Sequence, residues 1–95
     1  MNLNMNTSKL YLYHYQACPF CAITREAIKH IDLNIEQRDV LKEPNYRGEL
    51  VRGGGKPQVP CLKIEKENGT TQWLYESRDI IQYLQTEDAL LEVNA

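Results

Sequence analysis

The feature of this sequence best suited to chemistry is a pair of cysteines with two residues between them. Cys18 and Cys21 come shortly after a Leu- and Tyr-rich run, residues 10–15, whose continuous apolar character predicts a strand buried on both faces. The residues after Cys18 predict a helix, so Cys18 is expected at or near a helix N-terminus. Unpaired amides and the positive end of the helix dipole favour a thiolate at that position.

A cysteine pair at this position supports thiol–disulfide exchange. A Cys18 thiolate can attack a disulfide, and Cys21 can then release the mixed disulfide. The alternatives are a pair of inert buried cysteines or half of a zinc site. Zinc usually takes four ligands, and the remaining candidates, Cys61, His14 and His30, form no second close pair. The pattern therefore favours a redox pair, and we expect no metal.

The helix after Cys18 is predicted from its apolar periodicity. Its apolar residues recur at three-to-four spacing and are expected to face the core: Phe20, Ile23, Ala27, Ile28 and Ile31. Its polar residues fall largely on the other side: Arg25, Glu26, Lys29 and His30. This pattern predicts an amphipathic helix that packs on a sheet.

The remaining elements follow from turn and cap signals. Residues 34–40 predict an edge strand, and Glu43-Pro44 opens a short helix that three glycines, residues 53–55, should end. Residues 59–64 and 72–75 predict two strands of a hairpin, because Asn68-Gly69 between them is a strong turn signal.

The last helix has both a cap signal and an apolar stripe. Ser77 is expected to be its N-cap, with Asp79 in the first turn. Ile80, Ile81 and Leu84 supply apolar residues at helical spacing. The last helix is therefore expected to pack on the sheet.

The element order β-α-β-α-β-β-α defines an α/β fold. Its first half is a right-handed crossover with parallel strands, and its second half is a hairpin followed by a helix. We predict a four-stranded mixed sheet with three helices distributed over both faces. Residues 1–8 are expected to be a flexible N-terminal segment and residues 9–86 one domain. Residues 87–95 are expected to be a C-terminal extension or the end of the last helix.

Composition limits the functions that this chain can have. The chain has 95 residues, of which 42% are hydrophobic and 25% charged, which is typical of one globular domain. Its net charge of −2 argues against generic nucleic-acid binding. There is neither an apolar run of membrane-spanning length nor a signal-peptide pattern. We therefore expect a cytoplasmic protein with reduced thiols and with no membrane or nucleic-acid partner.

Three segments of the sequence resemble the glutaredoxins and their relatives of the thioredoxin-like fold. Two of them resemble the glutaredoxin cysteine motif and Val-Pro segment: Tyr15-Gln16-Ala17-Cys18-Pro19-Phe20-Cys21 and Lys56-Pro57-Gln58-Val59-Pro60. The third, Tyr75-Glu76-Ser77-Arg78-Asp79-Ile80, is more similar to the Glu-Ser motif of glutathione-transferase N-terminal domains. The resemblance covers residues 9–86, nearly the whole chain.

The resemblance implies where glutathione would bind. A cis peptide bond between Val59 and Pro60 would turn the backbone of Val59 outward, where it could pair with the peptide part of glutathione. The helix that starts at Ser77 would bind the γ-glutamyl carboxylate, and Glu76 would bind the ammonium group. Gln58 would also contact glutathione, as it can in the transferase pattern.

One departure from the glutaredoxin pattern concerns positive charge. Glutaredoxins commonly carry a lysine two or three residues before the first cysteine, and here Tyr15 and Gln16 occupy those positions. Both residues are kept as candidate glutathione contacts. The candidates for supplying the missing charge are Lys56, or Arg52 or Arg47 on the preceding helix, although each such residue is more often a solvated surface charge.

The resemblance implies a glutathione-dependent thiol–disulfide oxidoreductase of the dithiol type. Cys18 would be the nucleophile and Cys21 would resolve protein disulfides. Glutathione would be the co-substrate, oxidised or glutathionylated proteins the partners, and the chain a monomer. Cys61 is expected to be a buried packing residue. The alternatives are a glutathione or iron–sulfur binding module without turnover, a thioredoxin-like electron donor, and a detached transferase domain.

Overall fold

The computed structural model describes residues 9–94, and the predicted segment 1–8 lies outside the described residues. The chain forms seven elements in the predicted order. They are β1 (Lys9–His14), α1 (Pro19–Ile28), β2 (Ile35–Asp39), α2 (Pro44–Gly54), β3 (Cys61–Glu65), β4 (Thr71–Tyr75) and α3 (Ser77–Asn94). The last helix therefore continues through residues 87–94.

The four strands form one mixed sheet with the order β2-β1-β3-β4. β1 runs parallel to β2 and antiparallel to β3, and β4 is antiparallel to β3. The predicted mixed sheet is thus confirmed, and β2 is an edge strand as expected. Side chains alternate along β1, so Leu10 and Leu12 face one side of the sheet while Tyr11 and Tyr13 face the other. The prediction that β1 is buried on both faces is also confirmed.

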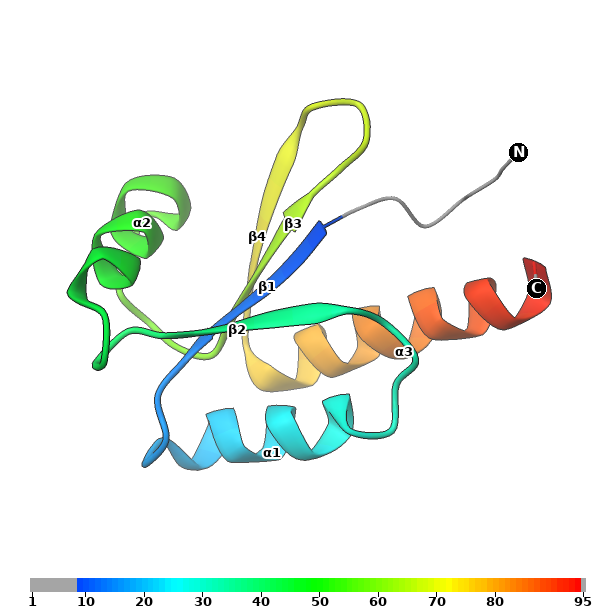
Figure 1. The fold of residues 1–95 in the computed structure, drawn as a ribbon, viewed down its shortest axis with the longest axis horizontal. Coiled ribbons are helices and arrows are strands. Elements are labelled where there is room, and N and C mark those ends of the chain that lie inside the picture. The colour runs from blue at the N-terminus through cyan, green and yellow to red at the C-terminus, as the bar shows by residue number, and fades with distance from the viewer. Residues whose placement is uncertain (1–8, 95) are drawn as a thin grey trace.

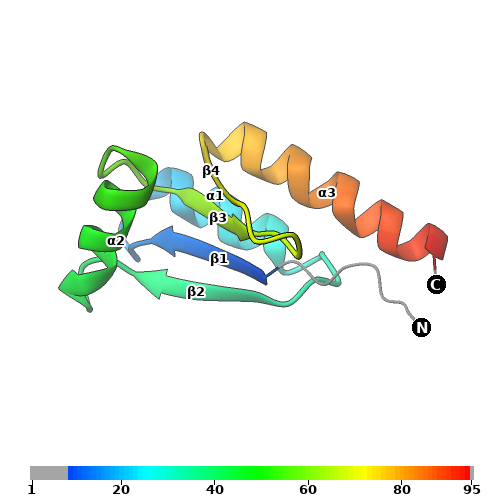
Figure 2. The ribbon, with the colours of Figure 1, turned by 90° about the horizontal axis from the view of Figure 1, so that it is seen from above.

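Helices cover both faces of the sheet. Figure 1 shows α1 and α3 side by side on one face, and both begin at the same end of the sheet. α2 lies across the other face, as the view from above also shows (Figure 2). The core between the sheet and the helices α1 and α3 is built on Leu10, Leu62, Ile64, Ile80 and Leu84. The core under α2 is built on Tyr13, Val40, Leu50 and Cys61. Among residues 9–94, no helix has the length and hydropathy that crossing a membrane requires.

The buried face of α1 differs from the predicted apolar stripe. Cys21 and Thr24 are fully buried, whereas Phe20 is 61% and Ile23 54% exposed. Thr24 can be buried because its hydroxyl donates to the carbonyl of Phe20 at 2.9 Å. The sequence pattern counted Phe20 and Ile23 as core residues because they are apolar at helical spacing. The helix packs instead through Cys21 and Thr24, while the predicted residues Ile28 and Ile31 do pack against the core.

The glycine triplet ends α2 later than predicted. Only Gly55 lies outside the helix, at φ 97°, in the left-handed conformation typical of a residue that follows a helix. Gly53 and Gly54 are its last helical residues. Aromatic side chains from β4 explain why both positions are glycine, because a Cβ on Gly53 would overlap the indole of Trp73 and one on Gly54 would overlap the hydroxyl of Tyr75.

The start of α3 also differs from the prediction. Glu76 precedes the helix in the left-handed conformation, at φ 78°, and its carbonyl accepts a hydrogen bond from the amide of Ile80 at 3.0 Å. Ser77 is therefore the first helical residue and not the N-cap. A left-handed Glu is uncommon among residues that have a Cβ, and a sequence pattern gives no sign of it.

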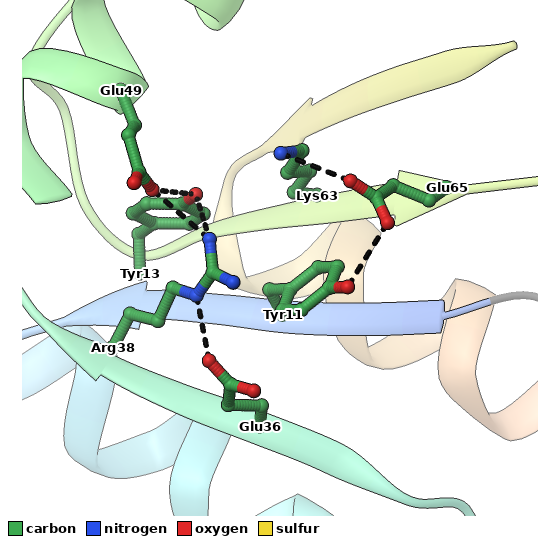
Figure 3. A network of polar contacts seen from close by, with 7 residues as sticks. All are labelled: Tyr11, Tyr13, Glu36, Arg38, Glu49, Lys63 and Glu65. Carbon is green, nitrogen blue, oxygen red and sulfur yellow. Dashed lines mark hydrogen bonds and ion pairs between the residues drawn. The ribbon is translucent and has the colours of Figure 1, made fainter.

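A polar network on the α2 face ties three elements together (Figure 3). Arg38 of β2 donates to the hydroxyl of Tyr13 at 2.8 Å, to Glu49 of α2 at 2.9 Å and to Glu36 at 2.8 Å. Its guanidinium also lies 4.0 Å from the ring centroid of Tyr11. These contacts fix α2 on the sheet, and with it the start of the loop that leads from α2 to β3.

Candidate active site

Cys18 is the N-cap of α1. Its Sγ accepts a hydrogen bond from the amide of Cys21 at 3.2 Å, and its carbonyl accepts one from the amide of Ala22 at 3.0 Å. The sulfur is thus held at the positive end of the helix, where an anion is stabilised. Pro19 occupies the first helical position, which needs no amide donor.

The two cysteines of the motif differ in their surroundings. Cys18 is 5% exposed and Cys21 is fully buried, and both are free thiols. Burial raises the pKa of the Cys21 thiol, and its contact with Cys18 adds to the increase. The backbone of Tyr15 and the positive charge of Arg25 lower that pKa in part. This asymmetry favours Cys18 as the attacking sulfur and Cys21 as the thiol that keeps its proton.

A cleft of about 600 Å³ lies beside the start of α1 and brings the three sequence segments together. The bond between Val59 and Pro60 is cis, as the resemblance implied. The cleft is lined by Phe20, Gln58, Val59, Pro60, Glu76, Ser77, Arg78 and Asp79. Five of the residues expected to bind glutathione therefore share one cavity.

The two expected glutathione segments already contact each other across this cleft. The side-chain amide of Gln58 donates to a carboxylate oxygen of Glu76 at 3.1 Å. Glu76 itself is exposed, so its carboxylate stays accessible to a ligand. An ammonium group that binds Glu76 would either share the carboxylate with the side-chain amide of Gln58 or displace that amide from it.

Three of the expected residues lie outside the lining of the cleft. Tyr15 packs against the core under α2, and Gln16 is exposed. The ammonium of Lys56 lies 4.7 Å from the ring centroid of Tyr75, whose hydroxyl donates to the carbonyl of Lys56 at 2.9 Å. These two contacts with Tyr75 hold Lys56, in the loop between α2 and β3, against β4.

Sequence reasoning missed several residues that the fold brings to this site. Phe20, Arg78 and Asp79 line the cleft, and their positions within or next to the quoted motifs were the available signal. Arg25 lies one helical turn after Cys21 and reaches back to the segment that precedes the motif. That spacing was the signal, but a charged residue on a helix usually indicates a solvated face.

Cys61 has surroundings unlike those of a reactive thiol. It is fully buried in the core under α2, and burial raises its pKa to about 12. A thiol that stays protonated at neutral pH is a poor nucleophile. Within residues 9–94, the structure shows no group of three or more His, Cys, Asp or Glu side chains that could hold a metal ion.

His14 at the end of β1 should make stability depend on pH. It is 2% exposed, and burial, followed by the charge of Arg25, lowers its pKa below the ordinary value. The unfolded chain binds a proton below about pH 6.5 that the folded chain resists. We therefore expect the free energy of unfolding to fall as pH drops below that value, by up to about 1 kcal/mol per pH unit.

Urea titrations at several pH values measure this dependence. His14→Asn should flatten it, and His30→Asn, which replaces an exposed histidine, is the comparison variant. An undiminished slope in the His14→Asn variant would assign the effect to other groups.

The sheet order, the cysteine pair at the start of α1 and the cis-proline before β3 together define a thioredoxin-like protein. Residues 12–90 match the family described as glutathione S-transferase, N-terminal domain, and the chain belongs to this family. The resemblance to glutathione-transferase N-terminal domains is thereby confirmed. A comparison with curated proteins gave no match.

Several solved structures share the fold. Maleylacetoacetate isomerase from Anaeromyxobacter dehalogenans 2CP-1 matches with a TM-score of 0.65 and 24% identity, over 90% of this chain and 38% of the isomerase. The thioredoxin-like protein BC3987 matches with a TM-score of 0.60 and 24% identity, over 78% of this chain and 97% of that one. Glutaredoxin from Brucella melitensis gives a TM-score of 0.54 and 18% identity, over 90% and 86%. The isomerase was also solved with glutathione in its active site.

Proposed function

We propose that this chain is a glutathione-dependent thiol–disulfide oxidoreductase of the dithiol type, and that it works in the cytoplasm. The observation that carries the proposal is the placement of Cys18. Its sulfur caps α1, accepts an amide hydrogen bond and lies next to a second, buried thiol. Family membership and the cleft formed by the Val-Pro and Glu-Ser segments support glutathione as the co-substrate.

The proposed reaction on a glutathionylated protein has two exchanges. The Cys18 thiolate attacks the glutathione sulfur of the mixed disulfide, and the target leaves as a thiolate. A second glutathione thiolate then attacks the glutathione sulfur bound to Cys18. Oxidised glutathione leaves and the Cys18 thiolate is restored. The mixed disulfide is consumed and oxidised glutathione is formed. The one incoming glutathione supplies the two electrons that reduce the target to a thiol, so the electrons balance.

A protein disulfide requires both cysteines. Cys18 attacks one sulfur of the disulfide, and the other leaves as a thiolate. Cys21 gives up its proton and attacks the Cys18 sulfur, which releases the target in its reduced form. The resulting Cys18–Cys21 disulfide is reduced by two glutathione molecules. Burial of Cys21 protects the resolving thiol from other oxidants until Cys18 has reacted.

Trapping the glutathione adduct tests the proposed binding step. Incubating a Cys21→Ser variant with oxidised glutathione should give one adduct per chain, because the resolving thiol is missing. Peptide mass mapping should locate the adduct on Cys18, and reduced glutathione should remove it. A Cys61→Ala, Cys21→Ser double variant should behave identically. A chain that takes no adduct, or takes it only on Cys61, would contradict the proposal.

A second candidate is glutathione transfer to an electrophile. Family membership and the Glu76-Ser77 segment beside the cleft favour it. The chain spans 38% of the isomerase that it matches, so the activity of that whole protein is not carried over. The two candidates are separated by supplying glutathione with either an aryl halide or a glutathione mixed disulfide. Consumption of the aryl halide alone would replace the reductase by the transferase.

A further inference from the structure

Arg25 holds the segment that precedes the cysteine motif. Its Nη1 lies 3.0 Å from Nδ1 of His14 and donates to the carbonyl of Tyr15 at 3.2 Å, and its Nη2 donates to the carbonyl of Gln16 at 3.2 Å. A guanidinium only donates hydrogen bonds. Nδ1 of His14 must therefore accept, which requires the neutral imidazole that carries its proton on Nε2.

The carbonyl of Tyr15 links Arg25 to the cysteine pair. The amide of Cys18 donates to this same carbonyl at 3.3 Å. The backbone of Tyr15 also contacts Cys21 and lowers the pKa of that thiol. Arg25, one helical turn after Cys21, therefore holds Tyr15, the residue whose backbone contacts both cysteines.

Arg25 also brings positive charge to the cysteine pair. Its charge lowers the pKa of Cys21. The other candidate cations are placed elsewhere: Lys56 lies over the ring of Tyr75, and Arg47 and Arg52 are exposed on α2, which covers the opposite face of the sheet.

Other titratable and charged groups surround the same region. Around Arg25 and the cysteines they are Cys21 of α1, His14 of β1, Asp39 of β2 and Lys42 of the following turn. On the cleft side they are Glu76, Arg78 and Asp79. Burial and the charge of Arg25 keep His14 neutral at neutral pH, so among Arg25 and its contacts the positive charge belongs to Arg25.

We propose that Arg25 is a positioning residue for Cys18. It fixes the carbonyl that accepts from the Cys18 amide, and it brings a positive charge to the cysteine pair. The assignment rests on the proposed function in one respect, namely that Cys18 is the reacting sulfur.

Alkylation of Cys18 by iodoacetamide, followed by peptide mass mapping, tests this role in the full-length chain. Arg25→Met should slow alkylation at neutral pH by about threefold to tenfold, because the thiolate loses a nearby charge and a fixed loop. The difference should shrink at alkaline pH, where the thiol ionises in both proteins. Arg25→Lys should lie between, because lysine keeps the charge but cannot bridge two carbonyls.

Arg47→Met is the matched control, since it removes an exposed arginine from α2. It should alkylate as the wild type does. Equal rates for Arg25→Met and Arg47→Met at neutral pH, in folded proteins, would overturn the proposal. If Arg25→Met does not fold, Arg25→Lys decides, and a wild-type rate in that variant would also overturn it. Alkylation needs no glutathione, so a wild-type chain without glutathione turnover would contradict the proposed function and leave this role intact.

Discussion

Replacing Cys18 by serine is expected to reduce glutathione-dependent reductase turnover by more than about a thousandfold. A serine hydroxyl stays protonated at neutral pH and cannot form the mixed disulfide. The fold should be unaffected, because a serine at the N-cap of α1 accepts the same amide hydrogen bond that the Cys18 sulfur accepts now. The loss would therefore belong to the chemical step.

The measurement is the reduction of a small glutathione mixed disulfide, coupled to glutathione reductase and its cofactor. Cys61→Ala is the matched control, because it removes a thiol that is buried and raised in pKa. It should keep most of the wild-type turnover. If Cys18→Ser turns over like the wild type, Cys18 is not the nucleophile and the proposed reductase mechanism fails.

Replacing Gly53 by alanine is expected to destabilise the fold by about 1–3 kcal/mol. Alanine in a helix is normally favoured over glycine by roughly 0.5–1 kcal/mol. At this position the added methyl would overlap the indole of Trp73, which packs against the core under α2. Either the ring or the helix must move, and the polar contacts of Arg38 with α2 oppose the movement.

Gly48 offers a matched control on the same helix. A Cβ there meets only the guanidinium end of Arg52, at 2.9 Å from Nη1, and that flexible side chain can move away. Gly48→Ala should therefore leave the free energy of unfolding unchanged or raise it by up to about 1 kcal/mol. Urea unfolding of both variants gives the comparison. Equal free energies of unfolding for Gly53→Ala and Gly48→Ala would show that the ring of Trp73 does not exclude a side chain at position 53.

The elements of this fold were predictable because local signals and tertiary structure agree. Three local signals predict their elements correctly: the apolar run of β1, the Asn68-Gly69 turn and the apolar spacing of α3. In the hairpin, Gly69 adopts φ 92° and the side chain of Asn68 accepts from the amide of Thr70 at 3.0 Å, as the turn chemistry required. The resemblance supplied the cis-proline, which no local pattern specifies.

The errors occur where tertiary contacts override local pattern. Phe20 and Ile23 continue an apolar stripe, but α1 presents them to the cleft side and to solvent. Gly53 and Gly54 are helical, and they are glycines because two aromatic rings of β4 occupy the space that a side chain would need. Ser77 lost its expected cap position because Glu76 adopts a left-handed backbone.

The sequence predicted which residues belong to the candidate site, but it did not predict the contacts between them. The motifs named the cysteines, the Val-Pro segment and the Glu-Ser segment, and the fold places the last two around one cleft. The role of Arg25 depends on how α1 folds back toward the end of β1, which periodicity does not report. The same applies to Lys56, whose ring contact with Tyr75 comes from a strand 19 residues away.

The edge strand β2 has a consequence for how copies of this chain meet. An uncovered strand edge can add a strand from another molecule and so begin aggregation. Three of the five residues of β2 are charged, namely Glu36, Arg38 and Asp39. Bringing a second β2 alongside would strip water from these charged side chains, which costs free energy. The polar composition that obscured this strand in the sequence is therefore also what protects the sheet from open-ended growth along that edge.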